Sequence, residues 1–303
     1  MTIAKTKPEK GDPSDVVQFF PNYNIQLLCC RHWWLENWEH TELSFPYWRI
    51  YHNNKNGAKV IYNENEYKLS PDQILLIAPN TSYATRLYNN EIPKQGYSFA
   101  GGPVIPDLDQ QNLSTKPYLL HFFIHFNIGI PYDNISPGVF RFELTDHLQS
   151  KLKLIKEHLN YDNKSFNFHT SLVIKSLITD ILSDLPESNW NLISNDHRII
   201  SCLRYIEGNL ADDLSNPTLA DKAKMATNAF IRLFSNEVGI SVQKYIRNKR
   251  IDSACIMLHH SNLSIDEIAL KTGFADRYHF SRIFKQSTGI SPARYKKEFG
   301  MNT

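Results

Sequence analysis

The sequence has little of what marks fibrous, disulfide-rich or membrane proteins. Glycine and proline number only 12 and 15 in 303 residues, which excludes a collagen-like chain. The four cysteines (Cys29, Cys30, Cys202 and Cys255) form neither a CxxC pair nor a dense disulfide framework. No apolar run approaches the ~20 residues of a membrane span, and the N-terminal stretch lacks the apolar core of a signal peptide. We therefore expect a cytoplasmic protein with reduced thiols and no membrane partner.

The net charge is also small, at +2, but the charged residues are distributed unevenly along the chain. Residues 197–303 hold 16 Lys and Arg against 10 Asp and Glu, whereas the remainder holds 17 against 21. The length fits two domains at roughly 100–200 residues each. A basic C-terminal third joined to an acidic remainder predicts a nucleic-acid-binding module attached to a second domain.

The acidic part begins with a predicted flexible arm, residues 1–18, followed by a β-rich region over 19–145. Short runs rich in Ile, Leu and aromatic residues alternate there with turn-forming clusters, which predicts a small antiparallel barrel. The strand-like runs are 25–30, 48–52, 59–62, 74–78 and 119–126. The Pro-, Gly- and Asn-rich stretch 89–116 predicts a long loop.

Helical periodicity begins after residue 145. Apolar residues recur at 3.6-type spacing over 146–159 and 168–185, so we expect a helical element over 146–186. Pro186 ends it, and 187–196 has the composition of a linker. Residues 197–303 are helical and basic throughout.

This basic segment contains an internal repeat. Phe234, Gly239 and Ser241 are matched 50 residues later by Phe284, Gly289 and Ser291, and further pairs match at offsets of 49 and 50. Each copy predicts a helix-turn-helix unit, at 216–238 and 264–288. In the first copy Asn216 is expected to cap a helix; in the second, Ser264 and Glu267 form a capping box and Gly273 ends the helix.

The second helix of each unit has one apolar and one polar face. The polar residues expected to enter a DNA major groove are Asn228 and Arg232 in the first unit and Arg277, Tyr278, His279 and Arg282 in the second. The alternative is that they contact only phosphate or solvent. A continuous helix over 241–260, about 30 Å long, would space the units close to the ~34 Å between successive major grooves. Phosphate contacts are expected of Lys222, Lys244, Lys249 and Arg250.

With these features the sequence resembles the AraC-type transcription regulators. The second unit, SIDEIALKTGFADRYHFSRIFKQSTGISPARYKK (264–297), follows that family's signature, whereas Lys224 replaces the usual turn glycine of the first. WRIYHNNKNGAKVIY (48–62) and YKLSPDQILLIAPNTSY (67–83) resemble the family's sugar-responsive barrel. The resemblance implies an α+β chain: a cupin-like barrel holding an effector, a helical dimerisation element, and a domain of two tandem helix-turn-helix units. It also implies promoter DNA, a small-molecule effector such as a sugar or similar polar metabolite, RNA polymerase and a second copy of the chain as partners.

Candidate effector residues are aromatic or histidine side chains of the β region. His121, Phe123 and His125 share one face of a strand; the set is completed by Trp48, His52 and Tyr83. An ordinary barrel core is the alternative for each. His121 and His125 would lie ~13 Å apart on a strand, and no His-x-His pair with a following Glu occurs, so no metal site and no cofactor are expected. Two competing functions stay open: a cupin-type metal-dependent enzyme, and a sensing module that acts through protein contacts alone. We expect a regulator rather than an enzyme.

Overall fold

The computed structural model describes residues 21, 23–94, 96–104, 118–159, 165–190 and 196–300. The predicted arm at 1–18 lies outside these residues. The N-terminal part is one antiparallel sheet of nine strands in the described part of the chain, in the order β4-β3-β6-β1-β8-β2-β5-β9, with β7 paired to β1. The strands are β1 Gln26–Leu43, β2 Trp48–Asn53, β3 Ala58–Tyr62, β4 Asn65–Leu69, β5 Gln73–Ile77, β6 Tyr83–Leu87, β7 Tyr97–Pro103, β8 Leu119–Asn127 and β9 Val139–Glu143.

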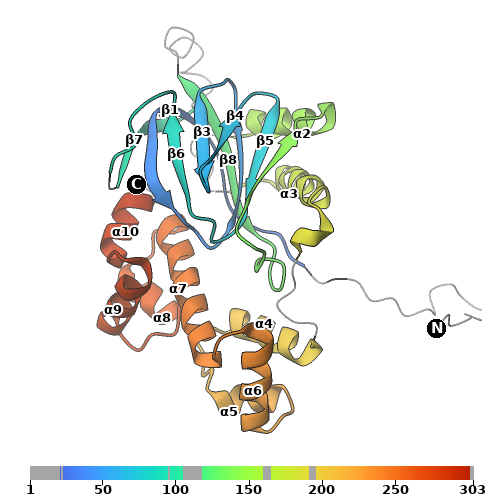
Figure 1. The fold of residues 1–303 in the computed structure, drawn as a ribbon, viewed down its shortest axis with the longest axis vertical. Helices are drawn as coiled ribbons and strands as arrows, with labels where there is room; N and C mark the ends of the chain where they lie inside the picture. Colours follow the sequence, from blue (N-terminus) through green and yellow to red (C-terminus); the bar gives the residue numbers. More distant parts are fainter. Residues whose placement is uncertain are drawn as a thin grey trace, which may run out of the picture.

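The long strand β1 curves this sheet into a nearly closed barrel (Figure 1). Its first half pairs with β8, and its second half pairs with β6 and β7. Register shifts between Leu27 and Cys29 and between Leu35 and Asn37 mark bulges in β1, and bulges bend a strand and increase its twist. The predicted barrel is therefore confirmed.

Strand alternation divides the barrel's side chains between an interior and an outer face. On β8, Phe122, Ile124 and Phe126 lie in an apolar cluster with helices α2 (Asp146–Glu157) and α3 (Phe168–Ser183). Leu119 and Phe123 belong instead to the cluster inside the barrel. Both helices begin at a side-chain cap, at Thr145 and Asn167, and both were expected from their periodicity.

The sequence underestimated the number of strands. Four were not predicted: β4, β6, β7 and β9. The prediction of one long loop over 89–116 is wrong for its middle, because β7 pairs with the second half of β1. Residue 95 and residues 105–116 of that stretch lie outside the described part. A short 3₁₀ helix, η2 (Glu187–Asn189), occupies the start of the predicted linker.

The C-terminal part, residues 196–300, is called the helical domain here. Its helices are α4 His197–Gly208, α5 Asn216–Lys222, α6 Thr227–Val238, α7 Val242–His260, α8 Ile265–Lys271, α9 Arg277–Thr288 and α10 Pro292–Phe299. Both helix-turn-helix units, the connecting helix and the capping box of Ser264 and Glu267 are confirmed. The first unit is capped by Ser215, one residue before the expected Asn216, because the Ser215 side chain accepts the Thr218 N–H. None of the helices in the described ranges has the length and apolar character of a membrane span.

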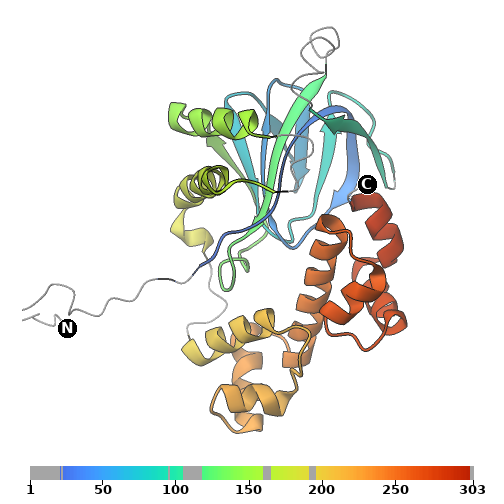
Figure 2. The same cartoon turned by 180° about the vertical axis from the view of Figure 1, so that it is seen from behind.

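The helical domain packs against one open end of the barrel (Figures 1 and 2). The C-terminal end of α7 and α10 lie directly below the sheet, α8 and α9 lie beneath them, and the first unit lies farther away. Phe45, in the turn between β1 and β2, contacts His259 of α7 and Phe299 of α10, with ring centroids 5.3 Å apart in each case. Side chains of the barrel interior and of α7 to α10 form one continuous apolar cluster. The loop after β8 makes a second junction, where Ile130 packs with α4 and the first unit.

Gly273, in the turn of the second unit, has a positive φ of 76° and backs onto the end of α4. A Cβ there would lie 2.2 Å from the Leu210 carbonyl oxygen, whereas Gly239, with φ 77°, has open space around it. Gly273→Ala should therefore lower the free energy of unfolding more than Gly239→Ala, by an additional ~1–3 kcal/mol of overpacking. Urea denaturation of both variants measures this, and equal losses would mean that the close approach has no energetic weight.

Candidate functional site

The second helices of the two units, α6 and α9, each bury one face and expose the other. Phe230 and Phe234 anchor α6, and Phe280 and Phe284 anchor α9, all four fully buried at i, i+4 spacing. The six residues expected to contact DNA all lie on the exposed faces: Asn228, Arg232, Arg277, Tyr278, His279 and Arg282. Tyr278 is 85% exposed, a large aromatic ring with no packing role. The arrangement leaves two polar helix faces free to enter grooves.

Local contacts fix the start of α9. Asp276 caps the helix by accepting the His279 N–H at 2.8 Å, and Arg277 forms an ion pair with Asp266 of α8 at 3.4 Å. In the first unit Lys224 occupies the turn position with φ 53°, a left-handed conformation that costs a non-glycine residue about 1–2 kcal/mol. Lys224 thus adopts the backbone conformation that a glycine would adopt in this turn, but with added backbone strain.

Helix α7 holds the two units apart. Its 19 residues span about 28 Å at 1.5 Å per residue, close to the separation expected from the sequence. The helix is anchored to both units, through Tyr245 and Ile246 in the first cluster and Ala254 and Leu258 in the second. It therefore serves as a rigid spacer.

Lys249 of α7 is not available for phosphate contact, so the sequence-based expectation is wrong for this residue. Its side chain is only 15% exposed and lies 3.4 Å from Glu207 and 3.9 Å from Asp252. It also donates to the Asn134 side chain of the barrel at 3.4 Å. Burial raises the pKa of Glu207 and that of Asp252, and the Lys249 charge opposes both shifts. Lys249 thus stabilises the junction between α4, α7 and the barrel.

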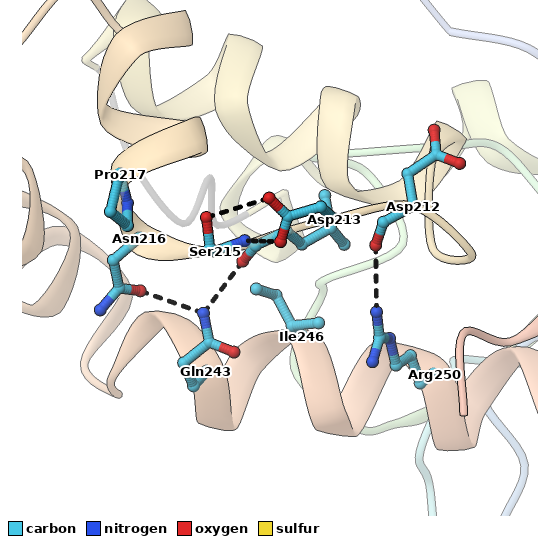
Figure 3. Close-up of a pocket in the computed structure, with 9 residues that line it drawn as sticks. Asp212, Asp213, Ser215, Asn216, Pro217, Gln243, Ile246 and Arg250 are labelled. Carbon is cyan, nitrogen blue, oxygen red and sulfur yellow. Dashed lines mark hydrogen bonds between the residues drawn. The ribbon is translucent and has the colours of Figure 1, made fainter. Parts of the chain in front are cut away.

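A groove of about 450 Å³ lies between α7 and the segment before α5 (Figure 3). Its polar groups bond to one another: Gln243 donates to the Leu214 carbonyl and to Asn216, and Arg250 donates to the Asp212 carbonyl. Arg250 was expected at phosphate, but its guanidinium is engaged within the domain. The groove is a joint between spacer and first unit, and nothing in it resembles the expected effector site.

Four of the six candidate effector residues lie together inside the barrel. The rings of His121 and Phe123 stack with their centroids 5.5 Å apart, and the centroids of the Phe123 and His125 rings are 5.1 Å apart. Tyr83 reaches the same interior from β6, where its hydroxyl lies 2.8 Å from that of Tyr51. Strand parity on β8 therefore placed these side chains correctly.

The other two, Trp48 and His52, face the opposite side of β2, under α2 and α3. Trp48 stacks on Phe126 and donates to Asp133 at 2.9 Å. His52 contacts the Pro71 carbonyl oxygen and Lys156 of α2. They are structural residues of the outer layer, and their assignment to the interior is corrected.

Arg49, which was not predicted as a site residue, lies on the interior face of β2. Its guanidinium is 3.6 Å above the Phe45 ring and donates to the hydroxyls of Tyr47, Tyr51 and Tyr83. Arg49 is 2% exposed, its Nε has no hydrogen-bond partner, and no ion pair to it occurs within the described residues. Because successive side chains of a strand point to opposite faces, Arg49 must face away from Trp48 and Ile50, and this alternation was the signal in the sequence that could have placed it.

Three histidines meet where the barrel contacts α7. His125 Nδ1 lies 3.4 Å from His260 Nε2, and His259 Nδ1 lies 2.5 Å from the Tyr47 hydroxyl. Burial lowers the pKa of His125 and His259 well below the usual value, and lowers that of His260 to about 3. These imidazoles are therefore neutral near pH 7.

Comparison with known proteins identifies similar chains for both parts. The family model described as a helix-turn-helix domain matches residues 219–298. The regulatory protein PocR of Salmonella typhimurium (strain LT2) is 30% identical over 152 residues, which cover 50% of this chain and 48% of PocR. The transcriptional activator RhaS of Citrobacter koseri is 30% identical over 99 residues, covering 33% of this chain and 36% of RhaS. The chain thus spans about half or less of the length of these curated relatives.

A solved structure matches nearly the whole chain. ToxT from Vibrio cholerae strain SCE256 superposes with a TM-score of 0.51 at 12% identity, covering 89% of this chain and 97% of ToxT. Wild-type ToxT with a bound unsaturated fatty acid gives a TM-score of 0.50 at 13% identity, covering 93% and 100%. The likeness shows the fold: a barrel followed by a helix-turn-helix domain.

Lys249→Ala should lower the free energy of unfolding by about 1–3 kcal/mol, because it leaves the half-buried Glu207 and Asp252 carboxylates without their cation. Lys244→Ala, on the exposed face of the same helix, should stay within about 0.5 kcal/mol of the wild type. Chemical denaturation compares them. Equal effects would show that the ion pairs of Lys249 do not stabilise the junction.

The free energy of unfolding should also decrease as the pH is lowered, because of His121. Burial lowers its pKa to about 3, while the unfolded imidazole takes up a proton below about pH 6.5. This one site then removes about 1.4 kcal/mol per pH unit below that value. His121→Gln should flatten the decline between pH 7 and 5 in urea titrations, and the exposed His169→Gln is the control. An unchanged slope in His121→Gln would argue against a buried neutral imidazole.

Proposed function

We propose that this chain, whose C-terminal part is an AraC-type helix-turn-helix domain, is a sequence-specific DNA-binding transcription regulator controlled by a small molecule in its barrel. The observation that carries the proposal is the pair of exposed polar faces on α6 and α9, whose units are joined by the helix α7, itself about 28 Å long. Two such faces suit successive major grooves of one DNA duplex. The similarity to PocR and RhaS, both named as regulators, supports a regulatory rather than an enzymatic role.

In this proposal Arg232 and Arg282 read base edges, since arginine can donate two hydrogen bonds to guanine. Asn228 suits adenine. Arg277, Tyr278 and His279, at the start of α9, complete the contact surface. The duplex would be promoter DNA in the cytoplasm, with RNA polymerase as the partner whose recruitment or exclusion changes transcription.

A homodimer fits the outer layer of the N-terminal domain. Phe168 is 79% exposed and Leu172 is 49% exposed, and they lie one turn apart on α3. Large apolar side chains grouped on one helix face indicate a contact surface. We assign this face to a second copy of the chain, in line with the helical dimerisation element expected over 146–186.

For the effector, Arg49 favours a carboxylate over a neutral sugar. A buried cation without an anionic partner costs several kcal/mol, and a ligand carboxylate would offset that cost. The fatty acid in the ToxT structure also carries a carboxylate. We therefore place an organic acid in the barrel, its charge on Arg49 and its apolar part against Phe123 and Trp38, with a sugar as the second candidate.

DNA binding is tested by selection from a random duplex library with the full chain. The wild type should enrich one motif. Arg282→Ala should weaken binding to it by about 1–3 kcal/mol and relax the preference at one position. Arg294→Ala is the matched control, because that residue is exposed on α10 and paired with Glu298. No enriched motif, or an unchanged motif in Arg282→Ala, would contradict the assignment.

The effector class is tested by thermal shift with organic acids and monosaccharides. A ligand that binds only the folded chain raises Tm by mass action. Acids should raise Tm in the wild type but not in Arg49→Met, and Arg49→Lys should retain part of the shift. A shift by sugars alone, or an acid shift that survives in Arg49→Met, would overturn the carboxylate assignment.

A further inference from the structure

A thiol and two imidazoles converge at the junction between the barrel and the helical domain. Cys29 of β1, His125 of β8 and His260 of α7 each offer one ligand atom, and these atoms lie within 4.8 Å of one another. Cys29 and His125 are directly paired across the two strands, so their side chains share the interior face. His260 approaches from the helical domain, at the last residue of α7.

The separations approach those around a tetrahedral metal ion. With Zn–N bonds of 2.0–2.1 Å, two imidazole nitrogens on one ion lie about 3.3 Å apart. The Nδ1 of His125 and the Nε2 of His260 are already 3.4 Å apart. The Cys29 sulfur lies within 4.8 Å of both nitrogens, so it must move by at most about 1.2 Å to reach the roughly 3.6 Å expected between a thiolate and an imidazole nitrogen on one ion.

We propose that Cys29, His125 and His260 form a binding site for a thiophilic divalent transition-metal ion of the Zn²⁺ class. One thiolate and two neutral imidazoles are the ligands that such an ion prefers, and a water molecule would complete the tetrahedron. On binding, the Cys29 thiol releases its proton to solvent, which leaves a net charge of +1 at the site. Cys29 and His260 are half-buried, so an ion can reach them.

The surroundings support the ligands. The rings of His260 and His259 are nearly parallel, with centroids 4.3 Å apart, and His259 forms a hydrogen bond with the Tyr47 hydroxyl. Tyr47 also contacts His125, with ring centroids 5.0 Å apart. These ring contacts restrict the orientation of the two ligand imidazoles. Arg49 is the cross-strand partner of His125, so its positive charge borders the site, while its guanidinium donates to Tyr47 and lies over the Phe45 ring.

The site would join two parts of the chain that are otherwise held by side-chain packing. Cys29 and His125 belong to the barrel, whereas His260 ends the spacer helix of the helical domain. An ion bound by all three therefore stabilises the docked arrangement relative to an opened one. This site stands independently of whether the chain binds DNA.

The test uses the full chain, freed of metal with a chelator and titrated with Co²⁺, whose thiolate complexes absorb in the near ultraviolet by charge transfer. One equivalent should produce this band, and Zn²⁺ should displace it and raise Tm. Cys30→Ala should keep the band, because Cys30 faces the opposite, helix-covered side of β1. Cys29→Ala should abolish it, and His260→Gln should weaken Co²⁺ binding at least tenfold.

Near-ultraviolet circular dichroism of each metal-free variant establishes that it is folded. Since His260 lies at a helix end and is half-buried, His260→Gln provides a second reading if Cys29→Ala does not fold. A wild type without the band would overturn the proposal. So would a band of unchanged strength in folded Cys29→Ala or His260→Gln, which would assign Co²⁺ to another thiol.

Discussion

The packing of α7 and α10 against the open end of the barrel is the contact on which the rest of the structure depends. Phe45 and Tyr47 leave the sheet at the β1–β2 turn and meet His259 and Phe299. The barrel's apolar interior thereby continues into the core of the second helix-turn-helix unit. Because the same helix α7 carries the first unit, the position of both α6 and α9 relative to the barrel is set at this one junction.

One group of buried polar side chains of the barrel lies at this junction. His125 and the Tyr47 hydroxyl contact α7, and Arg49 donates to Tyr47, so a ligand or ion bound among them would touch both parts of the chain or alter their contact. A ligand shifts a conformational equilibrium only through its different affinities for the two states. An effector at this junction would have a direct physical route to the exposed faces of α6 and α9, without a long chain of intermediates.

Much of this could be read from the sequence, and the failures have physical causes. The repeat fixed both helix-turn-helix units and the exposed residues of α6 and α9, because helical periodicity is local. Strands β4, β6, β7 and β9 are short, and β4, β6 and β9 each carry two or three polar residues among five, so their apolar signal is weak. The alternation of a strand predicts that His121 and His125 share one face. Placing Trp48 and His52 requires knowing which face of β2 lies inside the barrel, and the sequence does not show this. Lys249, and the meeting of Cys29 with His260, depend on contacts between residues more than 100 positions apart or on helix packing, which no local pattern encodes.

Calorimetric unfolding of the full chain tests this account most directly, because the junction makes the barrel and the helical domain one cooperative unit. The account predicts a single transition whose calorimetric and van't Hoff enthalpies agree. It also predicts that Tyr47→Ala, which removes the ring between His125 and His259, separates the transition into two. Two independent transitions in the wild type, unaffected by Tyr47→Ala, would contradict it.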